Sequence, residues 1–119
     1  MKEKEEKLKL IPKVEKYMEY VLGIIIKLPR TEKFSIGTEY KSSMYKMLSY
    51  IMLLNKISKI KKEEIMNVLN NIDAMLATQR IYLRIMYNNR WIDERKFKIT
   101  MEQIYETGRI LGGLIKYYA

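Results

Sequence analysis

Apolar side chains recur every three or four residues over four stretches of this chain, the spacing of helices that each bury one face. In the first stretch the apolar positions run from Ile11 to Leu28, and Pro29 ends the pattern because proline disfavours helix in the residue before it. Residues 1–10 mix lysine with glutamate, and we expect them to form a solvated, charged leader. The predicted helices span about 11–28, 32–56, 61–89 and 94–117.

The connections between the predicted helices are only a few residues long. Thr31 is placed to cap the second helix and Asp93 the fourth, since both side chains can accept from the first backbone N–H groups of a helix. Short connections make sequential helices antiparallel. The pattern therefore predicts an all-α, up-down-up-down antiparallel four-helix bundle that forms one domain over 11–119.

Three glycines, Gly108, Gly112 and Gly113, interrupt the last helical pattern, and each should cost a helix interior about 1 kcal/mol relative to alanine. The apolar spacing between Phe97 and Tyr118 places Gly108 where a core side chain belongs. We therefore predict that Gly108 and Gly112 form a smooth strip that lets this helix approach a neighbour closely. The alternative is that Gly112 and Gly113 end the helix as a C-cap.

The second half of the second helix, residues 47–54, is apolar on nearly every side, which is more than a bundle of this size covers. We take Ile51 and Leu54 as candidate helix-packing or assembly residues, and the surplus indicates self-association. Gln79 is a lone polar residue in the apolar heptads of the third helix. We expect it to specify register or subunit pairing through a buried hydrogen bond.

The chain contains no cysteine and no histidine, which excludes disulfides, thiolate metal sites and catalysis by a Cys or His nucleophile and base. No glutamate occupies a predicted core position, so we expect no metal and no cofactor. No nucleophile is paired with a base, and we expect a protein that is not an enzyme. Without a signal-peptide pattern or an apolar run of about 18–20 residues, we expect a cytoplasmic protein.

The 23 lysines and arginines outnumber the 14 acidic residues, giving a formal charge of +9. Such a basic balance indicates a polyanionic partner, nucleic acid first and an anionic membrane second. Solubility alone is the alternative explanation of the charge.

Four of the six arginines lie between residues 80 and 95, although lysine dominates elsewhere. Helical spacing places several of them on one flank, beside aromatic rings. Guanidinium groups next to rings can clamp phosphates and offer bases a stacking surface. The alternative is a solvated flank with the tryptophan as a plug at the end of the bundle. The predicted nucleic-acid-binding residues are Arg80, Arg84, Arg90, Trp91, Arg95 and Lys96.

Two segments resemble a known family. The segment 28–37, LPRTEKFSIG, is similar to the connection between the first two helices of the accessory variability determinant proteins of diversity-generating retroelements. The segment 107–116, TGRILGGLIK, is similar to their last-helix signature. These proteins are related to the four-helix bundles encoded in 23S rRNA intervening sequences.

The resemblance implies a bundle assembled as a ring of five with a basic surface, which binds RNA, DNA and the retroelement's reverse transcriptase. It also implies that Arg80, Arg84 and Arg90 belong to the nucleic-acid and polymerase surface. Leu114 stands where the family often has an aromatic residue. A structural or rRNA-associated protein of the intervening-sequence type is therefore the alternative.

Overall fold

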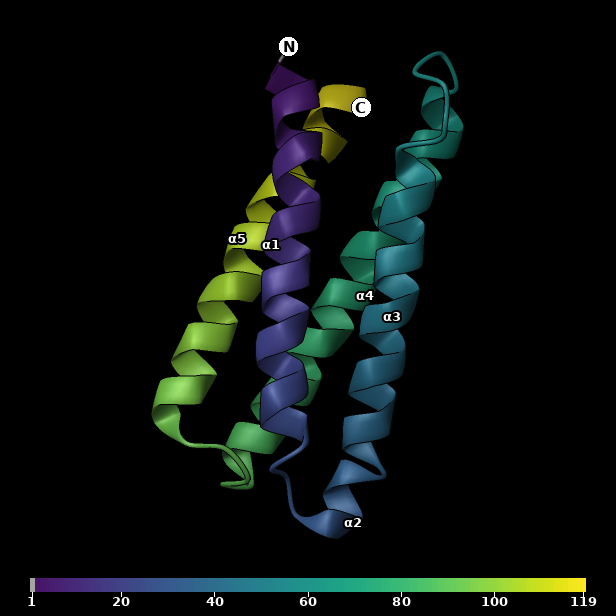
Figure 1. Cartoon of the computed structure of the whole chain (residues 1–119). Coiled ribbons are helices and arrows are strands. Elements are labelled where there is room, and N and C mark those ends of the chain that lie inside the picture. The colour runs from purple at the N-terminus through teal and green to yellow at the C-terminus, as the bar shows by residue number, and fades with distance from the viewer. Residues whose placement is uncertain (1) are drawn as a thin grey trace.

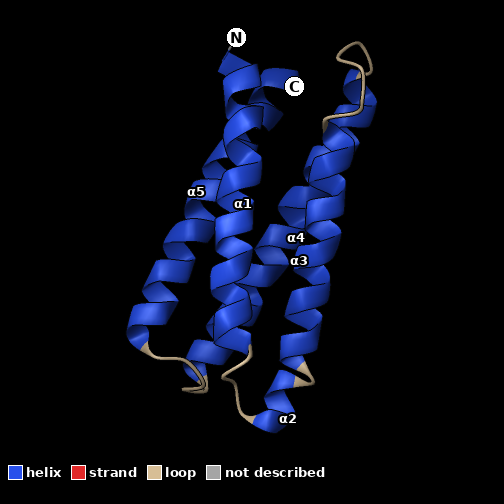
Figure 2. Ribbon diagram, in the orientation of Figure 1, coloured by secondary structure: helices blue, strands red, loops and turns tan. Residues whose placement is uncertain are grey.

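The computed structural model describes residues 2–119, and Met1 lies outside the described residues. Four long helices form an antiparallel bundle of 47 × 23 × 19 Å, as the sequence predicts (Figure 1). Figure 2 shows helices and loops, with no strand among the described residues. The elements are α1 (Lys2–Ile25), α2 (Arg30–Lys33), α3 (Ile36–Leu54), α4 (Lys62–Asn88) and α5 (Glu94–Tyr118).

Helix α3 packs on α4 and α4 on α5, whereas α1 packs mainly against α5 and only weakly against α3. Both ends of the chain lie at one end of the bundle, together with the connection from α3 to α4 (Figure 1). The short helix α2 and the connection from α4 to α5 lie at the opposite end. This topology brings residues near 27 and residues near 90 to the same end.

The predicted start of the first helix near residue 11 is wrong, because α1 begins at Lys2 and the described part of the charged leader is helical. Two of its residues are buried: Leu10 joins the core, and Glu3 lies beneath the end of α5. The Glu3 carboxylate accepts a hydrogen bond of 2.7 Å from the Tyr118 hydroxyl, and the ammonium groups of Lys7 and Lys59 lie 3.0 and 3.2 Å from its oxygens. Contacts with residues far along the chain therefore order a segment whose composition alone suggests a solvated leader.

The predicted second helix is divided in two. The short helix α2 ends at Lys33, and α3 begins at Ile36 after Ser35, so Thr31 does not cap the long helix. Gly37 explains why the chain bends tightly here. A Cβ at this position would lie 2.9 Å from Ile25 Cγ2 and 3.3 Å from the Glu32 carbonyl oxygen, so only glycine lets α3 start so close to α1.

The fourth predicted helix is continuous through all three glycines and ends at Tyr118, so the C-cap alternative is wrong. Its buried stripe differs from the predicted one. Thr107, and not Gly108, faces the core, and its hydroxyl donates to the Gln103 carbonyl at 2.9 Å. The full set of buried α5 residues is Thr100, Ile104, Thr107, Ile110, Leu111, Leu114 and Tyr118.

The predicted close approach at the glycines is therefore wrong within the chain. A Cβ at Gly108 would make an ordinary contact of 3.7 Å with Leu76, and a Cβ at Gly112 would meet nothing within 4 Å. The buried stripe of α5 includes neither Gly108 nor Gly112, so both glycines lie outside the core. Gly112 is exposed, and no contact among the described residues requires a glycine there.

A buried hydrogen-bond network joins three helices in the middle of the bundle. The Tyr17 hydroxyl of α1 donates to Gln79 Oε1 of α4 at 2.8 Å and lies 2.7 Å from the Tyr40 hydroxyl of α3. Gln79 Nε2 donates to Ser43 Oγ at 3.1 Å. Since Tyr17 has only one proton, Tyr40 must be the donor of the bond between the tyrosines. This network satisfies Gln79, which is fully buried, and fixes α1, α3 and α4 in one register.

The apolar surplus of the second half of α3 divides between the core and the surface. Ile51 and Leu54 are both buried within the chain's own core. Met52 and Leu53 point outward and are 49% and 45% exposed. Any assembly surface on this segment therefore includes Met52 and Leu53 and excludes Ile51 and Leu54.

Candidate nucleic-acid interface

Helix α4 ends in a Schellman motif in which Arg90 occupies the left-handed position. Its φ is +60°, the region that glycine usually fills at this point. The Trp91 N–H donates to the Met86 carbonyl and the Arg90 N–H to the Tyr87 carbonyl, both at 2.9 Å. A left-handed conformation costs a residue with a side chain about 1–2 kcal/mol. The chain thus holds an arginine where glycine would be more stable.

Asp93 then begins α5, as predicted. Its carboxylate oxygen Oδ1 accepts from the Lys96 N–H at 2.8 Å, the bond of an N-cap. The tight turn between the Schellman motif and this cap fixes Arg90 and Trp91 at the end of the bundle. Two adjacent helix ends therefore position the predicted basic residues.

A hollow at this end gathers three of the six predicted residues, Arg90, Trp91 and Lys96. Lys27, which follows α1, also lines it. Asp93 and Glu94 line it too, but the Asp93 carboxylate is engaged in its cap. The three cations, which come from two separate segments of the chain, can therefore contact phosphate oxygens in the hollow.

Aromatic rings form part of the hollow but are only partly available. Trp91 and Tyr87 are half-buried and pack against the core. The Tyr87 ring stacks on the Phe97 ring with centroids 4.2 Å apart and an interplanar angle of 12°. Trp91 thus closes the end of the bundle with its buried part, as the alternative interpretation expects. Its exposed part lines the hollow.

The other predicted arginines do not join this hollow. Arg80 lines a separate groove between α4 and α5, together with Arg109. Arg84 is exposed on α4 four residues after Arg80, and Arg95 is exposed near the start of α5. Arg84 follows Arg80 by about one helical turn, so a basic flank leads along α4 from the groove toward the hollow.

Sequence reasoning missed Lys27, Arg109 and Tyr105 as members of these sites. Tyr105 is 75% exposed and lines the groove with Arg80. Lys27 could have been predicted from the antiparallel topology, because the first and third long helices must end at the same end of the bundle. Tyr105 and Arg109 could not have been predicted in this way, because helical spacing alone does not say which flank of α5 faces α4.

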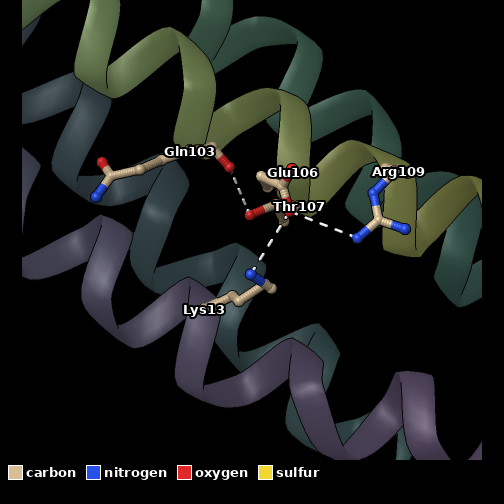
Figure 3. Close-up of polar contacts among 5 residues, drawn as sticks. All are labelled: Lys13, Gln103, Glu106, Thr107 and Arg109. Atoms are coloured by element: carbon tan, nitrogen blue, oxygen red, sulfur yellow. Dashed lines mark hydrogen bonds and ion pairs between the residues drawn. The ribbon is translucent and has the colours of Figure 1, made fainter.

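Figure 3 shows the surroundings of Arg109. Glu106 Oε2 lies 3.5 Å from Arg109 Nη2 and 3.6 Å from Lys13 Nζ of α1. One carboxylate is thus shared by two cations, and the group retains a net positive charge. Ion pairs exposed in this way stabilise a protein by about 0–1 kcal/mol, so Arg109 can turn to another anion at little cost in stability.

Residues 2–119 contain no cluster of three or more residues able to hold a metal ion. Within the same part of the chain, no helix is both long and apolar enough to cross a membrane.

Fold and site together define a class: a basic four-helix-bundle protein with cationic side chains gathered at one end and along one flank. Comparison with known families places the chain more closely. A family model described as bAvd-like matches residues 8–118, nearly the whole chain, and the protein belongs to that family. No curated protein and no solved structure matches it.

Proposed function

We propose that this protein is a non-enzymatic, nucleic-acid-binding accessory protein of a reverse transcriptase in a diversity-generating retroelement. Membership of the bAvd-like family supports the accessory role. Arg90 is the observation that carries nucleic-acid binding: an arginine kept in a strained backbone conformation beside Lys27 and Lys96. Strained residues of this kind concentrate at functional sites. The net charge of +9 supports contact through phosphates.

RNA binding measured over a range of salt concentrations tests this function. Replacing Arg80, Arg84 and Arg90 together with alanine should weaken binding and lower the logarithmic salt slope by about 0.7–0.9 for each phosphate that the protein no longer neutralises. The matched control replaces Lys4, Lys9 and Lys116 with alanine, because these exposed lysines carry the same total charge near the opposite end. Equal effects of the two triple variants would show that binding depends on net charge and not on this site.

The accessory role also includes self-assembly into a ring of five. The exposed side chains Tyr45, Met52 and Leu53 on α3 support this part of the proposal. In sedimentation without nucleic acid, the wild-type protein should form an oligomer at micromolar concentration, and Leu53→Lys should shift it toward the monomer. A wild-type monomer under these conditions contradicts the assembly.

We expect a reverse transcriptase to be encoded beside this gene, and co-purification of the two proteins tests their association. The expected neighbourhood also contains paired template and variable repeats. A position inside a 23S rRNA insertion would contradict the retroelement assignment.

A further inference from the structure

The groove between α4 and α5 is separate from the hollow at the end of the bundle. It encloses about 690 Å³, within the range of about 300–1,000 Å³ typical of small-molecule sites. Ala77 and Gly108 line it as small residues, and the apolar side chains of Leu76 and Ile104 also line it. A Cβ added at Gly108 would make only an ordinary contact of 3.7 Å with Leu76, so the groove has room for at least one more carbon atom there.

The rims of the groove carry an aromatic ring and two guanidinium groups. Tyr105 exposes three quarters of its surface, the most of any tyrosine among the large exposed apolar side chains. Arg80 stands on the opposing helix and makes no ion pair among residues 2–119. Arg109 shares its only carboxylate partner there with Lys13 (Figure 3). The Tyr105 ring can stack on a planar group, and the two arginines, which are not fully neutralised, can bind a phosphate attached to it.

Asp73 is the feature that a pure phosphate site does not explain. It lines the same groove and, within residues 3–119, also makes no ion pair. Its carboxylate would repel phosphate, but it can accept a hydrogen bond from the exocyclic amino group of a base. Adenine, cytosine and guanine carry such an amino group, whereas uracil does not. The carboxylate thus adds discrimination to a site that the arginines make basic.

We infer that the α4–α5 groove is a single-nucleotide site for single-stranded nucleic acid, in which the base stacks on Tyr105 and offers its amino group to Asp73 while Arg80 and Arg109 contact the flanking phosphates. This inference rests on the proposed function and deepens it, because it adds base discrimination to phosphate binding. The base enters where Gly108 and Ala77 leave room. A strand that passes the groove can follow Arg84 toward the hollow at the end of the bundle.

Fluorescence anisotropy with three labelled octamers tests the site: oligoadenosine, oligouridine and an abasic strand with the same phosphates. The wild-type protein should bind oligoadenosine at least about fivefold more tightly than the abasic strand, as expected for one stacked base. Tyr105→Ala should remove this advantage and leave abasic binding unchanged. Tyr117→Ala is the matched control, a tyrosine of the same helix that is 59% exposed and outside the groove, and it should change neither affinity.

Asp73→Ala provides a second readout that a purely structural role would not move. Removing the carboxylate should strengthen binding of the abasic strand, because a repulsive charge is removed, and should abolish the preference for oligoadenosine over oligouridine. Circular dichroism confirms that each variant stays helical. A deoxyadenosine octamer should bind like its ribose counterpart, since the assigned contacts involve only base and phosphate, and a tenfold preference would overturn that assignment.

The outcomes separate the two proposals. If the wild-type protein binds none of the strands, the proposed function fails. If it binds all three strands equally, or if Tyr105→Ala and Tyr117→Ala behave alike, the single-nucleotide site is wrong while phosphate binding stands.

Discussion

At the residue scale, Gly37 and Gly112 are the same residue type in opposite surroundings. Gly37→Ala should destabilise the protein by about 1–3 kcal/mol, because the new Cβ would overlap Ile25 and approach the Glu32 carbonyl. Gly112→Ala should stabilise it by about 0.5–1 kcal/mol, because an exposed helix position with open space gains the higher helix propensity of alanine. Urea denaturation measures both changes, and a destabilising Gly112→Ala would reveal a close partner at that surface.

Arg90 offers the same kind of test with a functional readout. Arg90→Gly should raise the free energy of unfolding by about 1 kcal/mol, because glycine adopts the left-handed conformation without strain. The same change should weaken RNA binding, since it removes a guanidinium group from the hollow. Arg95→Ala removes an equal charge from an exposed helical position and should leave stability nearly unchanged. A loss of stability in Arg90→Gly would mean that the arginine side chain itself holds the turn together.

At the scale of elements, the buried network decides how α1, α3 and α4 align. Tyr17 stands at its centre, because it donates to Gln79 and accepts from Tyr40. Burial raises the pKa of both tyrosine hydroxyls, so both keep their protons at neutral pH. The direction of every bond in the network is thus fixed by the number of protons available.

Two single-atom deletions in this network should have unequal effects. Tyr17→Phe leaves the side-chain amide oxygen of Gln79 and the Tyr40 hydroxyl buried without partners. It should destabilise the protein by about 2–3 kcal/mol. Tyr40→Phe removes only a donor to Tyr17, whose own bond to Gln79 survives, and should cost about 1 kcal/mol. Chemical denaturation compares them, with Tyr45→Phe on the surface of α3 as the control. Equal losses of stability would contradict the assigned bond directions.

Helix α5 shows what periodicity within one element leaves open. Two stripes with the same alternation of three and four residues run along it, one through Gly108 and one through Thr107. The two stripes share Ile104, Leu111 and Tyr118. At the positions between these, the structure buries Thr100, Thr107 and Leu114 in place of Met101, Gly108 and Ile115. Threonine can enter the core because its hydroxyl bonds to a backbone carbonyl within the helix.

At the scale of the whole molecule, Glu3 joins both ends of the chain to the connection between α3 and α4. Burial alone would raise the pKa of this carboxyl, but the hydrogen bond from Tyr118 and the ammonium groups of Lys7 and Lys59 lower it to about 2. A carboxyl whose pKa is lowered by folding stabilises the protein above its unfolded pKa, here about 4.5. That contribution disappears as the pH falls from about 4.5 to about 2.

Acid titration of stability tests this contact. In wild-type protein, Glu3 should contribute on the order of 2–3 kcal/mol to the free energy of unfolding at neutral pH, and this contribution should vanish by about pH 2. Glu3→Gln should lower stability at pH 7 and flatten the dependence below pH 4.5. Glu5→Gln, an exposed glutamate in the same first turn, is the control and should leave the wild-type profile intact. Identical profiles for the two variants would exclude a special role for Glu3.

The sequence by itself determined the four-helix bundle, the start of α5 at Asp93 and the inward position of Gln79. These features follow from periodicity, short connections and local capping, which act within one helix or between two helices that are consecutive in the sequence. It also determined the charge of +9 and the arginines near the end of α4. The resemblance of two segments, at 28–37 and 107–116, pointed to the family that the match over 8–118 shows.

Only the tertiary structure decided where α1 begins, which stripe of α5 is buried and which cations meet. Glu3 is ordered by a residue 115 positions away, and Lys27 lines the same hollow as Arg90 and Lys96, which lie far from it in the sequence. Adjacent helix positions differ by about 100° around the axis, so a shift of one residue is enough to exchange Met101, Gly108 and Ile115 for Thr100, Thr107 and Leu114 on the buried face of α5. Local sequence does not set that rotation, because it depends on which neighbouring helices are there to bury each face.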